Sequence, residues 1–223
     1  MGIRLLVWGD YALFSRPEMK TERVSYDVMT ASAARGIIEA IMYKPAIKWI
    51  IDKIYVYNPI KFTSIKRNEV SSKILASNVN QVMNGANKEL FLNPTSSSER
   101  QLRSSIVLKN VKYVIEAHFE MTDKAGERDS EEKFFAMASR RMKKGECFCN
   151  PYFGCKEFPV SFKLIEDDFV LPNEKEFAGE IDLGYMLYDM DYSNANNGEI
   201  NPMFVRVKMI DGVINFENAR PIQ

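Results

Sequence analysis

Residues 111–121 alternate between apolar and mostly polar side chains, as an extended strand with two different faces does. Val111, Tyr113, Ile115 and every second residue up to Met121 belong to one face of such a strand. Lysine, glutamate and histidine dominate the other face. The alternation therefore predicts a strand with one buried face and one mostly polar face.

A strand, a helix and a second strand are expected before this segment. The first strand covers Ile3–Trp8, and a polar loop follows over Ser15–Thr30. Thr30 is a suitable N-cap, and apolar residues recur after it with helical spacing, at Ala34, Ile37, Ile38 and Ile41. Pro45 ends this helix, and the apolar run Ile47–Tyr57 predicts a largely buried second strand.

The periodicity disappears between Thr63 and Arg103, where serine, asparagine, lysine and arginine dominate. About forty residues without clear structure are unusual inside a compact domain, and they indicate a functional insertion. Its cations are Lys66, Arg67, Lys73, Lys88, Arg100 and Arg103.

A second helix is predicted over about Ser130–Lys144. Asp129 and Glu132 have the spacing of a capping box, and Gly145 suits the C-terminal cap. The apolar face of this helix consists of Phe134, Phe135, Ala138 and Met142. A further strand is expected over Phe158–Leu164.

The resulting order is strand, helix, strand, insertion, strand, helix, strand. This βαββαβ order predicts an α+β chain whose first part is a ferredoxin-like domain, the fold also found in RNA-recognition motifs. The aromatic signatures of those motifs are missing from the sequence. The domain is expected over residues 1–164, with its insertion at about 63–104.

The remaining residues, 165–223, read as a small antiparallel sheet. Two strands over Phe204–Ile210 and Val213–Phe216 flank Asp211-Gly212, which is a strong hairpin signal. A third strand is expected over Ile181–Met190. The sequence therefore predicts a separate C-terminal domain of three strands.

Thirty basic and thirty acidic side chains give a formal net charge of zero, so bulk charge does not favour a nucleic-acid partner. The charges are nevertheless segregated, because Lys133–Lys156 is basic whereas Glu166–Asp191 is acidic. The apolar runs are too short to span a bilayer, and the N-terminus reads as a strand and not as a signal peptide. These features predict a cytoplasmic protein without a membrane partner.

Five cations form a basic stripe on the predicted second helix: Lys133, Arg140, Arg141, Lys143 and Lys144. The helix leads into a loop with glycines and the aromatic residues Phe148, Tyr152 and Phe153. Cations hold phosphates and aromatic rings stack on unpaired bases, so the pair of features favours RNA over a merely solvated helix face.

Tyr43 and Lys44 are placed by the pattern at the end of the first helix. A tyrosine can orient or deprotonate a ribose hydroxyl, and a lysine can neutralise charge on a phosphate. Taken alone, the pair is better interpreted as an aromatic packed on the sheet and a lysine at the negative end of the helix dipole.

His118 is the single histidine and lies between Glu116 and Glu120 on the polar face of its strand. Two flanking carboxylates would raise the pKa of the imidazole and could prepare it for acid–base chemistry. A histidine within a ladder of charges is the simpler interpretation.

Two groups of residues could in principle hold a metal ion. Cys147, Cys149 and Cys155 have a C-x-C-x5-C spacing that departs from zinc knuckles, so three reduced thiols are favoured. Asp182, Asp189 and Asp191 are better interpreted as solvated turn residues than as a carboxylate site.

Several segments, in order along essentially the whole chain, resemble the Dvulg-subtype (type I-C) CRISPR-associated Cas5 family. They include the sequences GDYA at 9–12, RPEMK at 16–20, RVSYDVMT at 23–30 and AARGI at 33–37. They continue with RNEVSSK at 67–73, EAHF at 116–119, GCKEFP at 154–159 and DLGYM at 182–186.

The resemblance implies a ferredoxin-like domain with a C-terminal sheet, and an endoribonuclease that needs neither a metal ion nor a cofactor. Its expected substrate is precursor CRISPR RNA, cut at the repeat hairpin by attack of a ribose 2′-hydroxyl on the adjacent phosphate. The protein is then expected to keep the 5′ handle, as a subunit of an interference complex with other CRISPR proteins.

The resemblance also implies a tyrosine at the end of the first helix and a Lys-His pair at the start of the second. Here the tyrosine position aligns with Met42, next to Tyr43, and the pair aligns with Lys133 and Phe134. Either Tyr43 and Lys133 suffice, or His118 substitutes, or cleavage is weak or lost. A purely RNA-binding subunit is the alternative. The residues expected to bind RNA are Arg16, Lys20, Arg23, Lys44, Arg67, Lys73, Arg140, Arg141, Lys143 and Lys144.

Overall fold

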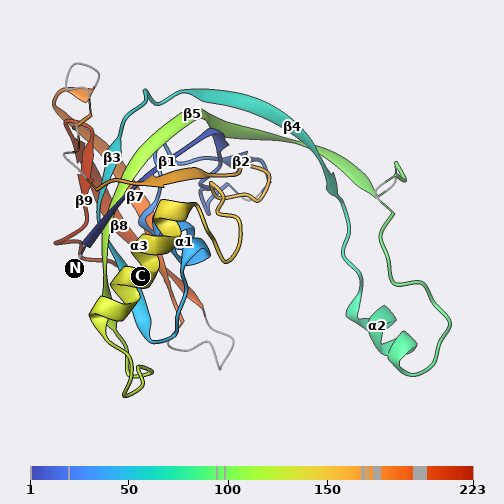
Figure 1. The fold of residues 1–223 in the computed structure, drawn as a ribbon. Helices are drawn as coiled ribbons and strands as arrows, with labels where there is room; N and C mark the ends of the chain where they lie inside the picture. Colours follow the sequence, from blue (N-terminus) through green and yellow to red (C-terminus); the bar gives the residue numbers. More distant parts are fainter. Residues whose placement is uncertain are drawn as a thin grey trace.

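The computed structural model describes residues 2–19, 21–93, 95–97, 99–166, 169, 171–172, 177–192 and 200–222. One sheet dominates these residues, with its main strands in the order β6-β1-β5-β3-β9-β8-β7 (Figure 1). The bounds are β1 Gly2–Ala12, β3 Ile47–Val56, β5 Arg100–Met121, β6 Ser161–Leu164, β7 Glu180–Asp191, β8 Asn201–Ile210 and β9 Val213–Asn215. Two further strands, β2 Arg23–Val24 and β4 Phe62–Val70, pair with β5. The chain is thus a mixed α+β protein with a large, mainly antiparallel sheet and few helices.

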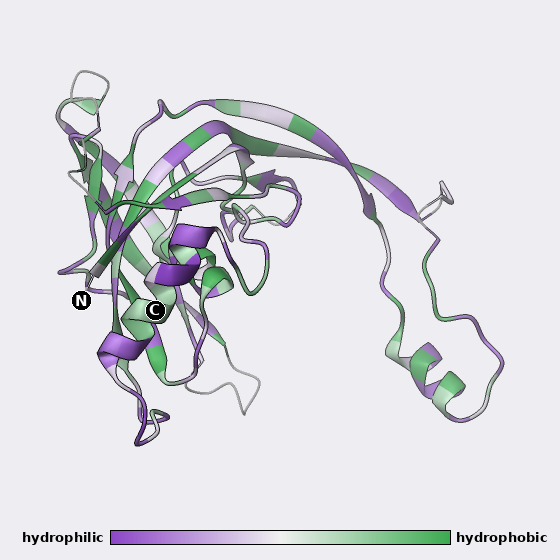
Figure 2. Ribbon diagram, in the orientation of Figure 1, coloured by the Kyte–Doolittle hydropathy of each residue, from purple (hydrophilic) through white to green (hydrophobic). Residues whose placement is uncertain are grey.

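Two helices, α1 (Ala31–Ile41) and α3 (Glu131–Lys144), cover one face of the sheet (Figure 1). The predicted alternation in β5 is confirmed on this face, because the odd-numbered residues from Val111 to Phe119 are all buried. They form one core with Leu5 and Val7 of β1 and with the apolar faces of both helices. Figure 2 shows hydrophilic residues alternating with more apolar ones along α3, as expected for a helix with one covered side.

Helix α1 begins as the sequence predicts and ends earlier than predicted. The Oγ1 atom of Thr30 accepts a hydrogen bond of 3.2 Å from the backbone N–H of Ala33, which satisfies one free donor of the first turn. The helix ends at Ile41, and Met42 is already extended. Tyr43 and Lys44 therefore follow the helix and do not lie in its last turn, because the chain must leave the helical conformation before Pro45.

Helix α3 is capped by Ser130 and not by Asp129. The Oγ atom of Ser130 accepts a hydrogen bond of 3.3 Å from the backbone N–H of Lys133. The Asp129 carboxylate instead accepts from the backbone N–H of Gly126, at 3.1 Å. At the other end, the predicted cap is confirmed, since Gly145 is left-handed with a φ of 68°.

The predicted insertion is an ordered arm and not a structureless loop (Figure 1). Strand β4 pairs with the first half of β5, and α2 (Ala76–Met83) lies near the tip. Ile65 of β4 packs against the core, but every residue of this strand is exposed or half-buried, so the strand has no buried apolar face and gives no hydrophobic alternation. Figure 2 shows hydrophilic and hydrophobic residues mixed along it.

A cluster of ion pairs fixes the base of the arm. The carboxylate of Glu69 lies 3.4 Å from Arg23, 3.3 Å from Arg67 and 3.5 Å from Arg103. Arg67 also reaches Glu157, at 3.1 Å, in the loop that precedes β6. The arm is thereby tied to the body of the protein on two sides.

The C-terminal strands form the expected antiparallel hairpins but not a separate sheet. Strand β9 pairs with β8 on one side and with β3 on the other. The β9–β3 pairs, from Lys53 with Asn215 to Tyr55 with Val213, join β7, β8 and β9 to the main sheet. Within the part of the chain that the structure describes, no helix is long and apolar enough to cross a membrane.

Candidate active site

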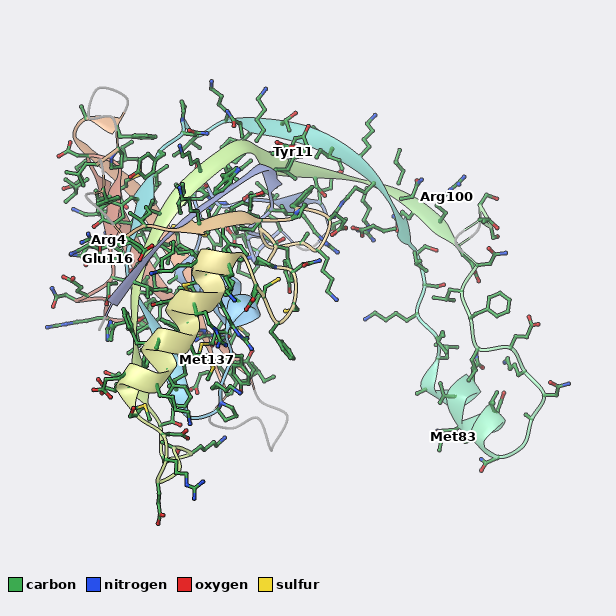
Figure 3. The ribbon with its side chains drawn as sticks, viewed as in Figure 1. Arg4, Tyr11, Met83, Arg100, Glu116 and Met137 are labelled. Carbon is green, nitrogen blue, oxygen red and sulfur yellow. The ribbon has the colours of Figure 1, made fainter. Side chains whose placement is uncertain are left out.

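A basic cleft lies where the chain leaving α1 meets the first turn of α3. Its volume is about 290 Å³, and it is lined by Lys44, Pro45, Ala46, Lys124, Asp129, Lys133, Phe134 and Met137. Figure 3 labels Met137 on α3, one turn beyond Lys133. Three lysines against one aspartate make this cleft a place for an anion.

Asp129 and the helix cap together hold Lys133. The Nζ atom of Lys133 donates to the Oδ1 atom of Asp129, at 2.8 Å, and to the backbone oxygen of Arg128, at 3.3 Å. The hydrogen bond from Lys133 is the main cause that lowers the pKa of the Asp129 carboxyl, and Gly126 N–H and the Lys44 charge add to it. Asp129 therefore stays ionised and orients the Lys133 ammonium at the mouth of the cleft.

Phe134 occupies the place where the family resemblance implies a histidine. Its side chain is 3% exposed and belongs to the core, and the Lys133 Nζ atom lies 5.6 Å from its ring centroid. A phenyl ring cannot exchange a proton. The cleft therefore contains cations and one carboxylate but no imidazole among its lining residues.

Met42 and Tyr43 point to different environments. Met42 is fully buried, and its backbone oxygen accepts a hydrogen bond of 3.1 Å from the indole of Trp49. Tyr43 is 56% exposed and directly precedes Lys44, which lines the cleft. Of the two residues, only Tyr43 presents its side chain to a large ligand.

His118 is not part of this cleft. Its neighbours Ala117 and Phe119 are buried under the helices, so the imidazole lies on the opposite face of the sheet. Its Nδ1 atom lies 2.8 Å from the Oδ1 atom of Asp52 on β3, at an irregularity in the β3–β5 register. The expected partners were Glu116 and Glu120, and the structure corrects this to Asp52. Glu116 is instead bound to Arg4, at 2.8 Å.

The basic stripe on α3 is only partly available to a ligand. Arg141 donates a hydrogen bond of 3.0 Å to the backbone oxygen of Ile41, where it caps α1. Lys143 pairs with Glu166, and Lys144 lies 3.8 Å from Glu146. Arg140 is exposed, and no ion pair is found for it among the described residues. Lys133 and Arg140 are thus the strongest members of the stripe.

The remaining expected RNA contacts are mostly structural. Arg16 pairs with Asp27 at 2.7 Å and stacks 4.7 Å over the ring of Tyr26. Arg23 and Arg67 belong to the base of the arm. Lys73 is exposed beyond β4, whereas Lys20 lies outside the described residues.

Neither of the two candidate metal groups forms a ligand set among the described residues. The three cysteines are free thiols, and Cys147 donates to the side chain of Asn150 at 3.6 Å. Asp189 is not the solvated turn residue that the sequence predicts. It lies within β7, is 14% exposed and pairs with Arg35 of α1.

A larger cleft of about 530 Å³ lies along the other part of α3, between Phe135 and the edge of the sheet. Its cations, Arg4 and Lys143, are each paired with a glutamate that also lines it. Because its charges are neutralised, we consider the smaller cleft at Lys133 the better anion site.

Sequence reasoning missed two residues of the cleft at Lys133. Lys124 follows β5 in a loop with no motif, and Asp129 was assigned only a capping role. Both residues lie in the short connection from β5 to α3, close to Lys133 in the sequence. The fold brings Lys44, from the chain after α1, to the same place.

The fold and the cleft together define a mixed α+β protein with a small basic cleft at a helix junction. A family model described as CRISPR-associated protein (Cas_Cas5), Cas5d type, matches residues 2–217. The chain belongs to this Cas5d family.

Two curated relatives are both named CRISPR pre-crRNA endoribonuclease Cas5d. The protein from Mannheimia succiniciproducens is 50% identical over 217 residues, which cover 96% of this chain and 93% of that protein. The protein from Thermus thermophilus is 37% identical over 190 residues, which cover 85% and 73%. A solved structure entitled "Crystal Structure of CRISPR-associated Protein" has the same fold, with a TM-score of 0.64 at 23% identity over 97% of this chain and 92% of the other.

Proposed function

We propose that this chain is an endoribonuclease that cuts precursor CRISPR RNA in its repeat and that the reaction takes place at the cleft of Lys133. The main support for this location is that Lys44, Lys124 and Lys133 line one cleft, next to the exposed Tyr43. The names of two relatives, which are 50% and 37% identical to this chain, support the substrate.

The proposed reaction is an attack of a ribose 2′-hydroxyl on the adjacent phosphorus. The new P–O bond closes a 2′,3′-cyclic phosphate, and the bond to the 5′-oxygen of the next nucleotide breaks. Tyr43 orients the 2′-hydroxyl and, in its phenolate form, accepts its proton, while Lys133 stabilises the charge that builds up on the phosphoryl oxygens. The leaving 5′-oxygen takes up a proton from water. Asp129 positions the Lys133 ammonium for this task.

The test is cleavage of the cognate repeat RNA in EDTA by the wild-type protein and two lysine variants. Lys133→Ala should slow cleavage about 100-fold or more, because a charge that stabilises the transition state is lost. RNA binding should stay within about threefold, because one contact of several is removed. Lys143→Ala is the matched control, since Lys143 lies on the same helix but pairs with Glu166. Equal cleavage by wild type and Lys133→Ala would remove Lys133 from the mechanism.

A second candidate function is a non-catalytic subunit that binds the repeat RNA. The buried Phe134 favours it, because no histidine is among the residues that line the cleft. In the same assay, tight binding of the repeat RNA without any product would identify this function and refute the nuclease.

For the fold, we propose that residues 1–164 are a ferredoxin-like domain with the arm as its insertion. The order β6-β1-β5-β3, with α1 after β1 and α3 after β5, supports this assignment. Residues 165–223 remain a predicted second unit, although β9 joins its strands to the same sheet.

We further propose that the protein keeps the 5′ handle after cleavage and serves as a subunit of a cytoplasmic CRISPR interference complex. Lys133 and the exposed Arg140 supply a basic surface for the retained RNA. Co-purification of the processed RNA with the protein, lost on raising the salt concentration, would test this role.

A further inference from the structure

The sheet has a second face, opposite to α1 and α3, and part of it exposes an aromatic residue. Trp8 of β1 is 39% exposed, whereas the preceding Val7 is buried in the core. The other tryptophan, Trp49, is 2% exposed and its indole N–H is hydrogen-bonded. The indole of Trp8 is therefore available to stack on a ligand, whereas that of Trp49 is not.

A cleft of about 320 Å³ surrounds Trp8, within the range of small-ligand sites. It is lined by Leu6, Trp8, Gly9, Asp10, Asn58, Asn110, Val111 and Lys112. The polar side chains among them are one carboxylate, two carboxamides and one ammonium. Such groups can form hydrogen bonds with the edge of a nucleobase and neutralise a phosphate.

The polar rim of this cleft is fixed by the backbone. Asn110 has a left-handed conformation with a φ of 53°, which marks an irregular step in β5. The side-chain Nδ2 atom of Asn58 donates a hydrogen bond of 2.8 Å to the backbone oxygen of Asn110. The two residues thus hold each other at the edge of the cleft and reduce the ordering cost of binding.

Lysines lie on both sides of Trp8. Lys112 is directly opposite Trp8 in the β1–β5 register, and its Nζ atom lies 5.6 Å from the ring centroid of Tyr57. Lys163 of the edge strand β6 is opposite Leu6, so it lies on the same face, and it is exposed. An aromatic plane between two cations is the arrangement that binds single-stranded nucleic acid.

Part of this face is covered by the protein itself. Arg4 and Glu116 form their ion pair there, next to each other in Figure 3. The ring of Phe169 packs on Tyr55, with 4.7 Å between the centroids, and lies 5.1 Å below the Arg4 guanidinium. Trp8 remains exposed beside these contacts.

We propose that this cleft binds an unpaired nucleotide of single-stranded RNA. The base stacks on the indole of Trp8, and Asp10 and Asn58 form hydrogen bonds with the base edge. Lys112 and Lys163 hold the neighbouring phosphates. The site lies on the opposite face of the sheet from Lys133, so it goes beyond the proposed nuclease and does not depend on cleavage.

The experiment measures binding of a fluorescent, unstructured RNA of about ten nucleotides by anisotropy. Trp8→Ala should weaken binding by roughly 5- to 150-fold, the range for loss of one base–aromatic stack. Trp8→Phe should bind within about threefold of wild type, because a phenyl ring still stacks. Tyr185→Ala is the matched control, since Tyr185 is a 56% exposed strand aromatic on β7, away from the cleft.

The proposal is overturned if Trp8→Ala binds this RNA like the wild type, or if Tyr185→Ala loses as much affinity. Wild-type binding by Trp8→Ala would indicate that the sheet face around Trp8 binds another kind of partner, such as a protein. Should Trp8→Ala fail to fold, Trp8→Phe with Lys112→Glu replaces it, and a salt dependence equal to that of wild type would refute the site.

Cleavage of repeat RNA is followed in parallel with the same proteins. Normal cleavage with unchanged binding by Trp8→Ala refutes only the new site. If Trp8→Ala binds RNA like the wild type and the wild type does not cleave repeat RNA, both proposals are refuted. If Trp8→Ala binds more weakly and no protein cleaves, only the new site is supported.

Discussion

Phe134 is the residue that decides how the cleft at Lys133 can act. Its ring is buried beside the Lys133 ammonium, where the family resemblance implies an imidazole. Phe134→His would place a group with a pKa near 6.5 at the edge of the cleft. We expect cleavage to become about tenfold faster or more, since a positioned acid or base contributes 10²- to 10⁴-fold.

The same substitution should lower the free energy of unfolding by about 1–3 kcal/mol, because a polar ring enters the core. Its rate should also gain a dependence on pH between about 5.5 and 7.5. Phe135→His is the control, because Phe135 is half-buried and lines the other cleft. A folded Phe134→His protein with the wild-type rate would contradict this role for the position.

Gly154 shows how closely one backbone position is constrained. Its φ is +77°, and a Cβ atom there would lie 1.9 Å from the backbone oxygen of Leu13. Gly154→Ala should therefore lower the free energy of unfolding by more than about 2 kcal/mol, seen as a lower midpoint in urea. Gly36→Ala offers the opposite case, since nothing lies within 4 Å of its added Cβ.

On helix α1, Gly36→Ala should raise the free energy of unfolding by about 0.5–1 kcal/mol, because alanine loses less backbone entropy in a helix. Equal midpoints for the two glycine variants would refute the packing argument at Gly154.

The partners of individual side chains are difficult to predict from the sequence when they lie on a neighbouring strand. Glu116 and Glu120 are the nearest carboxylates to His118 along the chain, but they lie two residues away on either side. The actual partner, Asp52, comes from the neighbouring strand, at a register irregularity between Ile51 and Lys53. A bulge cannot be recognised from alternation alone, so the contact between His118 and Asp52 was not predictable.

Among the elements, the arm depends on a single carboxylate. Glu69 faces three arginines, and Arg67 is 14% exposed with a buried Nε atom that has no hydrogen-bond partner. Glu69→Gln leaves these cations without their common counter-ion. We expect amide hydrogen exchange within Phe62–Val70 to become about tenfold faster, equivalent to about 1.4 kcal/mol of local opening.

Glu89→Gln is the matched control for the arm, because Glu89 is an exposed glutamate beyond α2. It should leave exchange in β4 unchanged. If Glu69→Gln also left it unchanged, the ion-pair cluster would not be what holds the base of the arm.

The elements with one buried face were predictable, and the arm was not. Helices α1 and α3 and the C-terminal half of β5 bury apolar residues at their own periods, so hydrophobic spacing reveals them. Strand β4 alternates only between exposed and half-buried side chains. The β5 residues opposite its outer half, Arg100–Ser104, are likewise exposed or half-buried, so pairing there leaves no hydrophobic signature. The cleft at Lys133 was half predictable for the same reason, since Lys133 lies on a recognisable helix and Lys124 on a featureless loop.

At the scale of the whole molecule, one sheet joins the two predicted units. Val205, Val207 and Met209 of β8 are buried in the same core as the helices. A chain ending at residue 164 would lack strands β7, β8 and β9. It would expose the part of the core that they cover and would leave the edge of β3 unpaired. We expect it to aggregate, or to lack a cooperative thermal transition. A monomeric, cooperatively folding fragment 1–164 would instead show two independent domains.

Strand β5 runs for 22 residues from the arm into the centre of the sheet, pairing with β4 up to Leu108 and with β1 from Leu108 to His118. The arm therefore continues directly into the centre of the sheet, where the same strand is hydrogen-bonded between β1 and β3. Met83 lies at the far end of the arm in Figure 3. A pull that the arm transmits along β5 therefore acts on the backbone hydrogen bonds that join β5 to β1 and β3, in the centre of the sheet.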